Sequence, residues 1–279
     1  MMIKISADST CDLSPKLREE LDVAIIPLSI IIDEDEIFKD GVDIGPADVF
    51  RFVDGGSTCR TGAVNVFEYQ SHFKKLAEEN DAVIHISLGS KFSSCYANAA
   101  LAAEEFDNVY VVDSQNLSTG SGHLVCDAAA MAAQGVEPEE IKRRLEAVVP
   151  KVNASFVIDQ LDYLAKGGRC SAVTAQGAKI LKLKPCIEVR DGEMVVGRKF
   201  RGNFDKAITG YAKKRLETEG IDPSRIFITH AGCAPETVDM IRDIVEESGK
   251  FQEIHITEAG CTISSHCGPN TLGVLFKEL

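Results

Sequence analysis

Apolar segments with the pattern of buried strands alternate along this chain with segments that have the pattern of amphipathic helices. In the first half, the strand-like segments are residues 2–7, 25–32, 82–88 and 108–113. Runs rich in valine and isoleucine are typical of strands that are buried on both faces of a parallel sheet. Because helical segments separate them, the sequence predicts an α/β fold with mostly parallel sheets.

Capping residues indicate where two of these helices begin. Ser14 is followed directly by Pro15, and proline fits the first position of a helix. Asn65 is followed three residues later by Glu68, which is the spacing of a capping box. We therefore expect helices to start directly after Ser14 and Asn65.

The second half of the chain differs because it contains a hairpin signal. Residues 185–200 are two strand-like runs joined by Asp191-Gly192, a pair that favours a tight turn between antiparallel strands. Further strand-like segments at 154–159 and 225–231 are separated by helical patterns. A mixed sheet is therefore expected in this half.

The length of 279 residues suits two domains better than one core. We expect a unit at residues 1–155 and a second unit at residues 156–279, although no proline- or serine-rich linker marks the boundary. No apolar run approaches the roughly 20 residues that span a bilayer, and the first residues lack the pattern of a signal peptide. Nine cysteines without CxxC spacing are expected to be reduced thiols, which favours a cytoplasmic location.

Charge is unevenly distributed in this acidic chain. The formal net charge of −13 argues against nucleic acid as the main partner, because phosphate groups would be repelled. Between Lys166 and Arg201, however, nine lysines or arginines accompany three acids. This basic segment is either a docking face or phosphate site, or a solvated surface.

Several polar residues fall where ligands collect in α/β proteins, at the ends of strands that lead into helices. Ser93 follows a strand and precedes a helix, where it could hold an anion or cap the helix. Thr61 precedes another helix, and His266 precedes a Gly-Pro turn; either residue could be purely structural. Asp8 and Asp12 could bind a metal or form a turn.

Standard catalytic motifs are not found in this sequence. There is no GxGxxG after a strand, no GxxxxGK[ST] phosphate loop, no GxSxG elbow and no HExxH. Their absence favours a binding protein over an enzyme.

Five segments, in order along the chain, resemble the DegV family. They are "ISADSTCDL", "ISLGSKFSSCYANA", "VVDSQNLSTGSG", "LDYLAKGGRCS" and "HCGPNTLG". The last segment is similar to the family's H-x-G-P-G-x-L-G, with Asn270 at the final glycine of H-x-G-P-G. Asparagine tolerates the left-handed backbone that this turn needs.

The resemblance implies a two-domain fold and a function in lipid metabolism. DegV proteins are fatty-acid-binding subunits of bacterial fatty acid kinase. They take a long-chain fatty acid from the membrane and present its carboxylate to a separate ATP-dependent kinase. The acyl phosphate formed there enters phospholipid synthesis. On this reading the chain is not itself an enzyme and needs no metal or other cofactor.

The resemblance also assigns roles to single residues. Thr61, Ser93 and His266 correspond to the carboxylate contacts, whereas Arg169 and Arg201 correspond to basic positions that face the kinase or the entrance. Around Thr61 the chain reads "TGAV" where the family often has T-S-Q-P, so the hydroxyl is kept and its neighbours are not.

The residues that would hold the lipid tail are less clear from the sequence. Candidates are Ile26, Leu28 and Ile30, together with the segment "AVTAQGAKILKL" at residues 172–183. Each of them could equally belong to the ordinary core. Aromatic residues make up only 6% of the chain, so an aliphatic lining is expected.

Two other functions stay open at this point. The chain could be a metal-dependent enzyme acting on a small hydroxylated or phosphorylated metabolite, with Asp8 and Asp12 as ligands and His266 as acid or base. It could also be a lipid carrier or sensor that works without a kinase.

Overall fold

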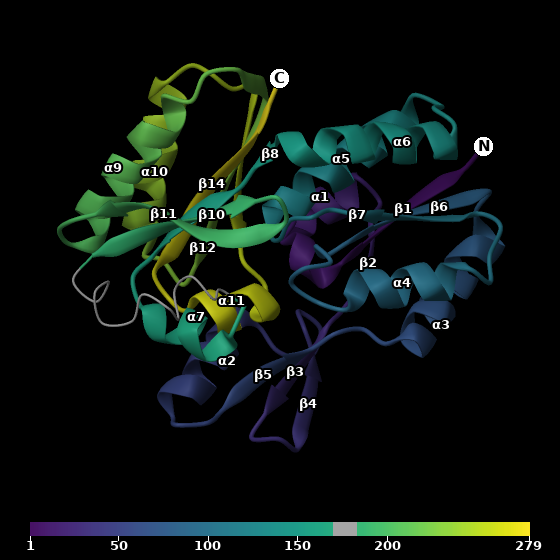
Figure 1. Ribbon diagram of the computed structural model, residues 1–279, viewed down its shortest axis with the longest axis horizontal. Helices are drawn as coiled ribbons and strands as arrows, with labels where there is room; N and C mark the ends of the chain where they lie inside the picture. Colours follow the sequence, from purple (N-terminus) through teal and green to yellow (C-terminus); the bar gives the residue numbers. More distant parts are fainter. Residues whose placement is uncertain (170–182) are drawn as a thin grey trace.

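In the computed structural model, which describes residues 1–169 and 183–279, the first half of the chain surrounds a four-stranded parallel sheet (Figure 1). Its strands in spatial order are β2 (Ala24–Ile26), β1 (Ile3–Asp8), β6 (Ala82–Ser87) and β7 (Val109–Asp113). All three neighbouring pairs run parallel, and β6 is buried along its whole length. This sheet confirms the parallel arrangement that the apolar runs predict.

Helices cover both faces of this sheet. One face packs against α3 (Val66–Glu79) and α4 (Cys95–Ala103). The other packs against α1 (Pro15–Glu20), α5 (Thr119–Ala133) and α6 (Pro138–Val148), and a short 3-10 turn, η1 (Ser9–Cys11), follows β1. Both predicted helix starts are confirmed, because Ser14 accepts a hydrogen bond from Leu17 N–H and Asn65 forms a capping box with Glu68.

A seven-stranded mixed sheet forms the centre of the second half. Six strands lie in the order β11 (Glu193–Phe200), β10 (Lys184–Arg190), β9 (Ser155–Ile158), β14 (Thr271–Glu278), β12 (Ile221–Ala231) and β13 (Glu253–Glu258). The seventh, β8 (Val152–Asn153), follows the turn η2 (Val149–Lys151) and pairs with β14. Helices α9 (Phe204–Leu216) and α10 (Pro235–Glu247) pack on this sheet.

The predicted α/β class with a mixed second sheet is confirmed. β10 and β11 are the predicted hairpin, and the turn residues Asp191 and Gly192 have φ angles of 51° and 75°. Within the described part of this sheet, the only parallel pair is β12 with β13. The division of the chain at residues 155 and 156 stays a prediction.

A small antiparallel sheet, which the sequence analysis does not foresee, lies below the two larger ones in Figure 1. It consists of β4 (Glu36–Lys39), β3 (Ser29–Ile32) and β5 (Cys59–Gly62), and α2 (Pro46–Asp54) follows β4. The segment 25–32, expected as one parallel strand, is divided between β2 and β3. Pro27 lies at the division, and proline has no N–H to donate within a sheet.

Two short helices from the second half pack near this small sheet. They are α7 (Leu161–Gly167) and α11 (Cys261–Cys267), which contact each other, and α11 also contacts α2 and β5. This packing brings residues of β5 and α11 together although they are about 200 positions apart.

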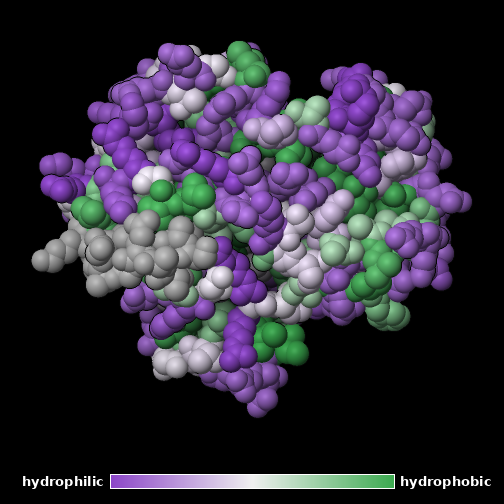
Figure 2. Space-filling view, in the orientation of Figure 1, coloured by the Kyte–Doolittle hydropathy of each residue, from purple (hydrophilic) through white to green (hydrophobic). Residues whose placement is uncertain are grey.

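The visible face of the molecule is mostly hydrophilic, with hydrophobic side chains gathered over α4, where Leu101 is exposed (Figure 2). Of the helices in the described part of the chain, none is long and apolar enough to cross a membrane.

Candidate functional site

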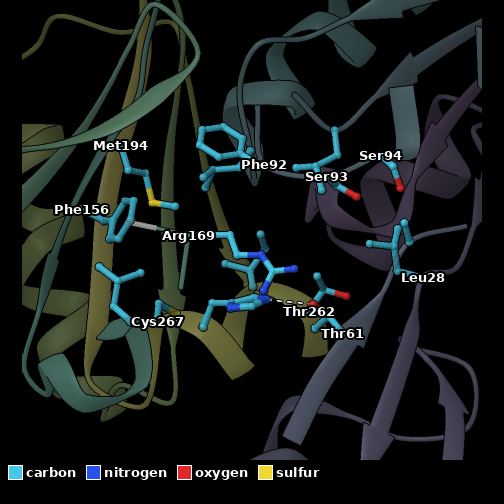
Figure 3. A pocket seen from close by; sticks show the side chains of 16 residues that line it. Leu28, Thr61, Phe92, Ser93, Ser94, Phe156, Arg169, Met194, Thr262 and Cys267 are labelled. Carbon is cyan, nitrogen blue, oxygen red and sulfur yellow. Dashed lines mark hydrogen bonds between the residues drawn. The ribbon is translucent and has the colours of Figure 1, made fainter. Parts of the chain in front are cut away.

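A cavity of about 240 Å³ lies where the three sheets meet. Figure 3 shows side chains from the two halves of the chain facing each other across it, with Phe92 on one side and Phe156 and Met194 on the other. Leu28, Leu88 and Leu117 follow the carboxyl ends of β2, β6 and β7, where ligands collect in parallel sheets. Most of the wall is apolar.

Thr61 and His266 form a hydrogen bond at the edge of this cavity. Thr61 Oγ1 on β5 lies 2.9 Å from His266 Nε2 on α11. The ring fits closely against α7, since a Cβ atom added at Gly167 would lie 2.3 Å from His266 Nδ1. The structure thus brings together two residues that the sequence analysis places in one site.

His266 is a neutral imidazole at neutral pH. Burial of the ring, assisted by the nearby positive charge of Arg169, lowers its pKa from 6.5 to about 4. Nδ1 is buried and has no hydrogen-bond partner among the described residues. A buried N–H without a partner is rarer than an under-used acceptor, so we assign the proton to Nε2. His266 then donates to Thr61, and the Thr61 hydroxyl hydrogen stays available for a ligand.

This lowered pKa of His266 predicts a measurable titration. Because the folded pKa lies below the unfolded value, the neutral ring's contribution to stability is complete above pH 6.5 and is lost as the pH falls towards 4. We expect NMR of the imidazole to show a midpoint near 4. In Arg169→Gln the midpoint should rise yet stay below 6.5, because burial is the larger cause. A wild-type midpoint near 6.5 would contradict this electrostatic description.

Ser93 lines the same cavity and also contacts the first residue of α4, directly before the N-cap residue Ser94. Its Oγ accepts a hydrogen bond from Cys95 N–H at 3.2 Å and lies 3.2 Å from Cys95 Sγ. Ser93 thus accepts a hydrogen bond at the start of α4 without being the N-cap residue, and this bond does not exclude ligand contact. The Cys95 thiol is a weak acceptor, so the Ser93 hydroxyl can turn its hydrogen to a better one.

Thr262 is a candidate site residue that the sequence analysis does not identify. It lines the cavity, and its buried hydroxyl has no hydrogen-bond partner in the part of the chain that is described. Its neighbours Ser264 and Ser265 donate instead to the carbonyl oxygens of Ala259 and Thr262. The signal for Thr262 is its spacing, because residues 262 and 266 lie one turn apart on α11.

The two arginines of the basic segment lie in different places. Arg169 lines the cavity and donates to the Gly167 carbonyl oxygen at 2.8 Å. Arg201 is exposed in the turn between β11 and α9 and does not line this cavity.

Of the predicted tail residues, Leu28 alone lines the cavity as far as the structure describes the wall. Ile26 belongs to the same core cluster as Leu28 without lining the cavity, and Ile30 is buried in a separate cluster. Residues 172–182 of the remaining candidate segment lie outside the described residues.

The aspartates of the proposed metal site are engaged in other contacts. Asp8 accepts hydrogen bonds from Tyr69 OH, Ser87 Oγ and Leu88 N–H, and Asp12 accepts one from Gly260 N–H. The described residues contain no group of three or more His, Cys, Asp or Glu side chains that could hold a metal ion.

The fold and the cavity define a class of α/β protein with an apolar pocket where three sheets meet and a few uncharged donors at its edge. A family model described as an uncharacterised protein of the DegV family matches residues 2–279. The chain belongs to the DegV family.

Known relatives cover the whole chain. A DegV domain-containing protein of Caldanaerobacter subterraneus subsp. tengcongensis is 33% identical over 285 residues, covering 99% of each chain. A fatty acid-binding protein of Thermotoga maritima is 31% identical and covers 98% of this chain and 96% of its own. The structure also resembles a fatty-acid-binding DegV family protein from Thermus thermophilus, with a TM-score of 0.90, 28% identity and complete coverage of both chains.

Proposed function

We propose that this protein binds a long-chain fatty acid, with the carboxylate at Thr61 and Ser93, with His266 acting through Thr61, and with the tail in the apolar cavity. The hydrogen bond between Thr61 and His266, at the edge of a largely apolar cavity, is the observation that carries the proposal. The fatty-acid binding of relatives over the whole chain supports it.

The tail supplies most of the binding free energy. A fatty acid of about sixteen carbons has roughly fourteen methylenes, and burying each favours binding by ~0.8 kcal/mol, an upper bound near 11 kcal/mol before association losses. The bilayer buries the same tail, so a protein must offer comparable apolar surroundings. Phe92, Phe156 and Leu117 provide such surroundings here.

The head group needs hydrogen-bond donors, because a buried carboxylate without partners is very unfavourable. Thr61 and Ser93 each offer a hydroxyl, and Thr262 adds a third. His266 acts through Thr61, because its Nε2 already contacts that hydroxyl. This differs from the direct imidazole contact that the family resemblance implies.

An uncharged set of donors suits a carboxylate that must react. We propose that the bound head group is presented to a separate ATP-dependent kinase, which forms an acyl phosphate for phospholipid synthesis. A direct arginine salt bridge would reduce the nucleophilicity of the carboxylate oxygen. Arg169 beside the cavity and the exposed Arg201 are the basic residues proposed to face the kinase, and contact with a membrane surface is proposed to be transient.

Organic extraction of the protein, purified from a heterologous host, tests the binding function. We expect a long-chain fatty acid to be recovered in about one-to-one ratio with the protein and identified by mass spectrometry. Recovery of no fatty acid, together with no uptake of palmitate from phosphatidylcholine vesicles, would overturn the proposal.

Charge reversal separates a kinase subunit from a carrier that works alone. Arg201→Glu, at the arginine that lies outside the cavity, should strongly reduce acyl phosphate formation by the kinase while palmitate uptake from vesicles stays close to wild type. Unchanged kinase coupling in this variant would favour the carrier without a kinase.

A further inference from the structure

Asp40 contacts the start of the helix that carries His266. It lies at the end of the small sheet, directly after β4, and is buried with 4% of its surface exposed. Its Oδ1 accepts a hydrogen bond from Cys261 N–H at 2.8 Å, and its Oδ2 accepts one from Thr262 N–H at 3.2 Å. One side chain of the first half thereby satisfies two N–H groups in the first turn of α11.

The same side chain also reaches the opposite wall of the cavity. Ser9 Oγ donates to Asp40 Oδ2 at 3.0 Å and accepts from Leu28 N–H at 3.2 Å. Leu28 lines the cavity, as Thr262 does. A chain of hydrogen bonds therefore joins the backbone of Leu28, through Ser9 and Asp40, to the backbone of α11.

The hydrogen bonds of Asp40 fix the position of α11, and α11 in turn determines where His266 lies relative to Thr61. Thr61 belongs to β5 and His266 to α11, so their 2.9 Å contact depends on how α11 sits against the small sheet. Acceptors at the N-terminal turn of a helix hold it through otherwise unpaired N–H groups. At the adjoining position, Gly260 N–H donates to Asp12, which leaves the two following N–H groups to Asp40.

Only an acceptor of two or more hydrogen bonds suits this place. An asparagine at residue 40 has nearly the same shape as aspartate. Its NH2 group, however, would face an N–H or O–H group that now donates a hydrogen bond to Asp40, so that bond would be lost. The substitution would leave no cavity, because the two side chains have nearly the same volume. A loss of function in this variant would therefore be caused by the lost hydrogen bonds and not by a change in packing.

We propose that Asp40 is a positioning residue for recognition of the lipid carboxylate, acting through α11 on His266 and Thr61. This inference rests on the proposed function and goes beyond it, because it states which buried side chain gives the site its preference for an acidic head. Asp40 does not line the cavity and makes no contact with the ligand in this proposal.

Comparison of palmitate with hexadecanol tests the proposal, because the two ligands share a tail and differ in the head. Uptake of each from phosphatidylcholine vesicles is measured for wild type and for Asp40→Asn. We expect the affinity for palmitate to fall about tenfold and that for hexadecanol to stay within about threefold, as loss of head-group hydrogen bonds alone would produce. Equal loss of both ligands, or no loss of either, would overturn the inference.

Asp43→Asn is the matched control. Asp43 lies in the same segment and accepts a hydrogen bond from Lys39 N–H at 2.6 Å, but it is exposed and makes no hydrogen bond to α11 among the described residues. This variant should discriminate between palmitate and hexadecanol as wild type does. A loss of discrimination equal to that of Asp40→Asn would show that the loop as a whole, rather than Asp40, is responsible.

A measurement on the wild-type protein covers the case in which Asp40→Asn does not fold. Hydrogen exchange of the Cys261 and Thr262 amides should slow several-fold on addition of palmitate and change little with hexadecanol. Binding of the carboxylate and the hydrogen bonds of Asp40 to the first turn of α11 are expected to stabilise each other. Identical exchange with both ligands would contradict the proposal. Failure of wild type to take up either ligand would instead overturn the proposed function itself.

Discussion

Thr61→Val should weaken palmitate binding by about 10- to 100-fold, the effect of removing a hydrogen bond to a charged group. Valine keeps the shape of threonine at a β position, so β5 and its pairing with β3 should be unchanged. The substitution removes a donor to the carboxylate and also leaves His266 Nε2 without its partner. The dissociation constant can be measured by palmitate uptake from phosphatidylcholine vesicles.

Thr61→Ser is the control, because serine retains the hydroxyl. It should bind palmitate within a few-fold of wild type. Equal binding by the valine and serine variants would show that the Thr61 hydroxyl does not contact the head group, and the proposed site would be wrong. Ser93→Ala should have a smaller effect than Thr61→Val, since it leaves the hydrogen bond between Thr61 and His266 in place.

The sequence analysis correctly predicts the α/β class, the hairpin and two helix starts, because each depends on neighbouring residues. Asn270 has a φ angle of 53°, so it takes the left-handed conformation expected where the family has glycine. The division of residues 25–32 between two strands does not follow from the sequence pattern. Apolar residues continue past Pro27, whereas the pairing with β1 ends at Ile26.

For the candidate site, local pattern and family resemblance identify residues but not their arrangement. They name Thr61 and His266, but the contact between them arises from the packing of α11 against the small sheet. Phe156 and Met194 enter the cavity from the mixed sheet, and no feature of their own segments marks them. Ile26, Leu28 and Ile30 share one alternation, yet Leu28 alone of the three lines the cavity. Ile26 shares a core cluster with Leu28, and Ile30 belongs to another cluster.

Gly167→Ala should also impair lipid binding strongly, by about tenfold or more, through displacement of His266. The added Cβ would lie 2.3 Å from His266 Nδ1, and so close an approach forces the ring to move. The ring lies between α7 and β5, so it cannot turn away without losing its hydrogen bond to Thr61. The Thr61 hydroxyl would then no longer be oriented towards the carboxylate, and loss of one such hydrogen bond to a charged ligand corresponds to about a tenfold change in affinity.

Gly168→Ala separates this steric effect from a general weakening of the helix end. Gly168 has a φ angle of 68°, which is unfavourable for alanine, but its added Cβ would have no heavy atom of the described residues within 4 Å. This variant should lose about 1 kcal/mol of stability and keep its affinity for palmitate. Gly167→Ala should lose affinity, because its Cβ displaces the imidazole of His266, and the gain in helix propensity of about 1 kcal/mol does not offset that displacement. Thermal unfolding and palmitate uptake, measured on both variants, should therefore show a loss of stability in both and a loss of affinity in Gly167→Ala alone. An equal loss of affinity in the two variants would mean that α7 acts on the cavity only through its stability, and that the close contact with His266 does not orient the donor at Thr61.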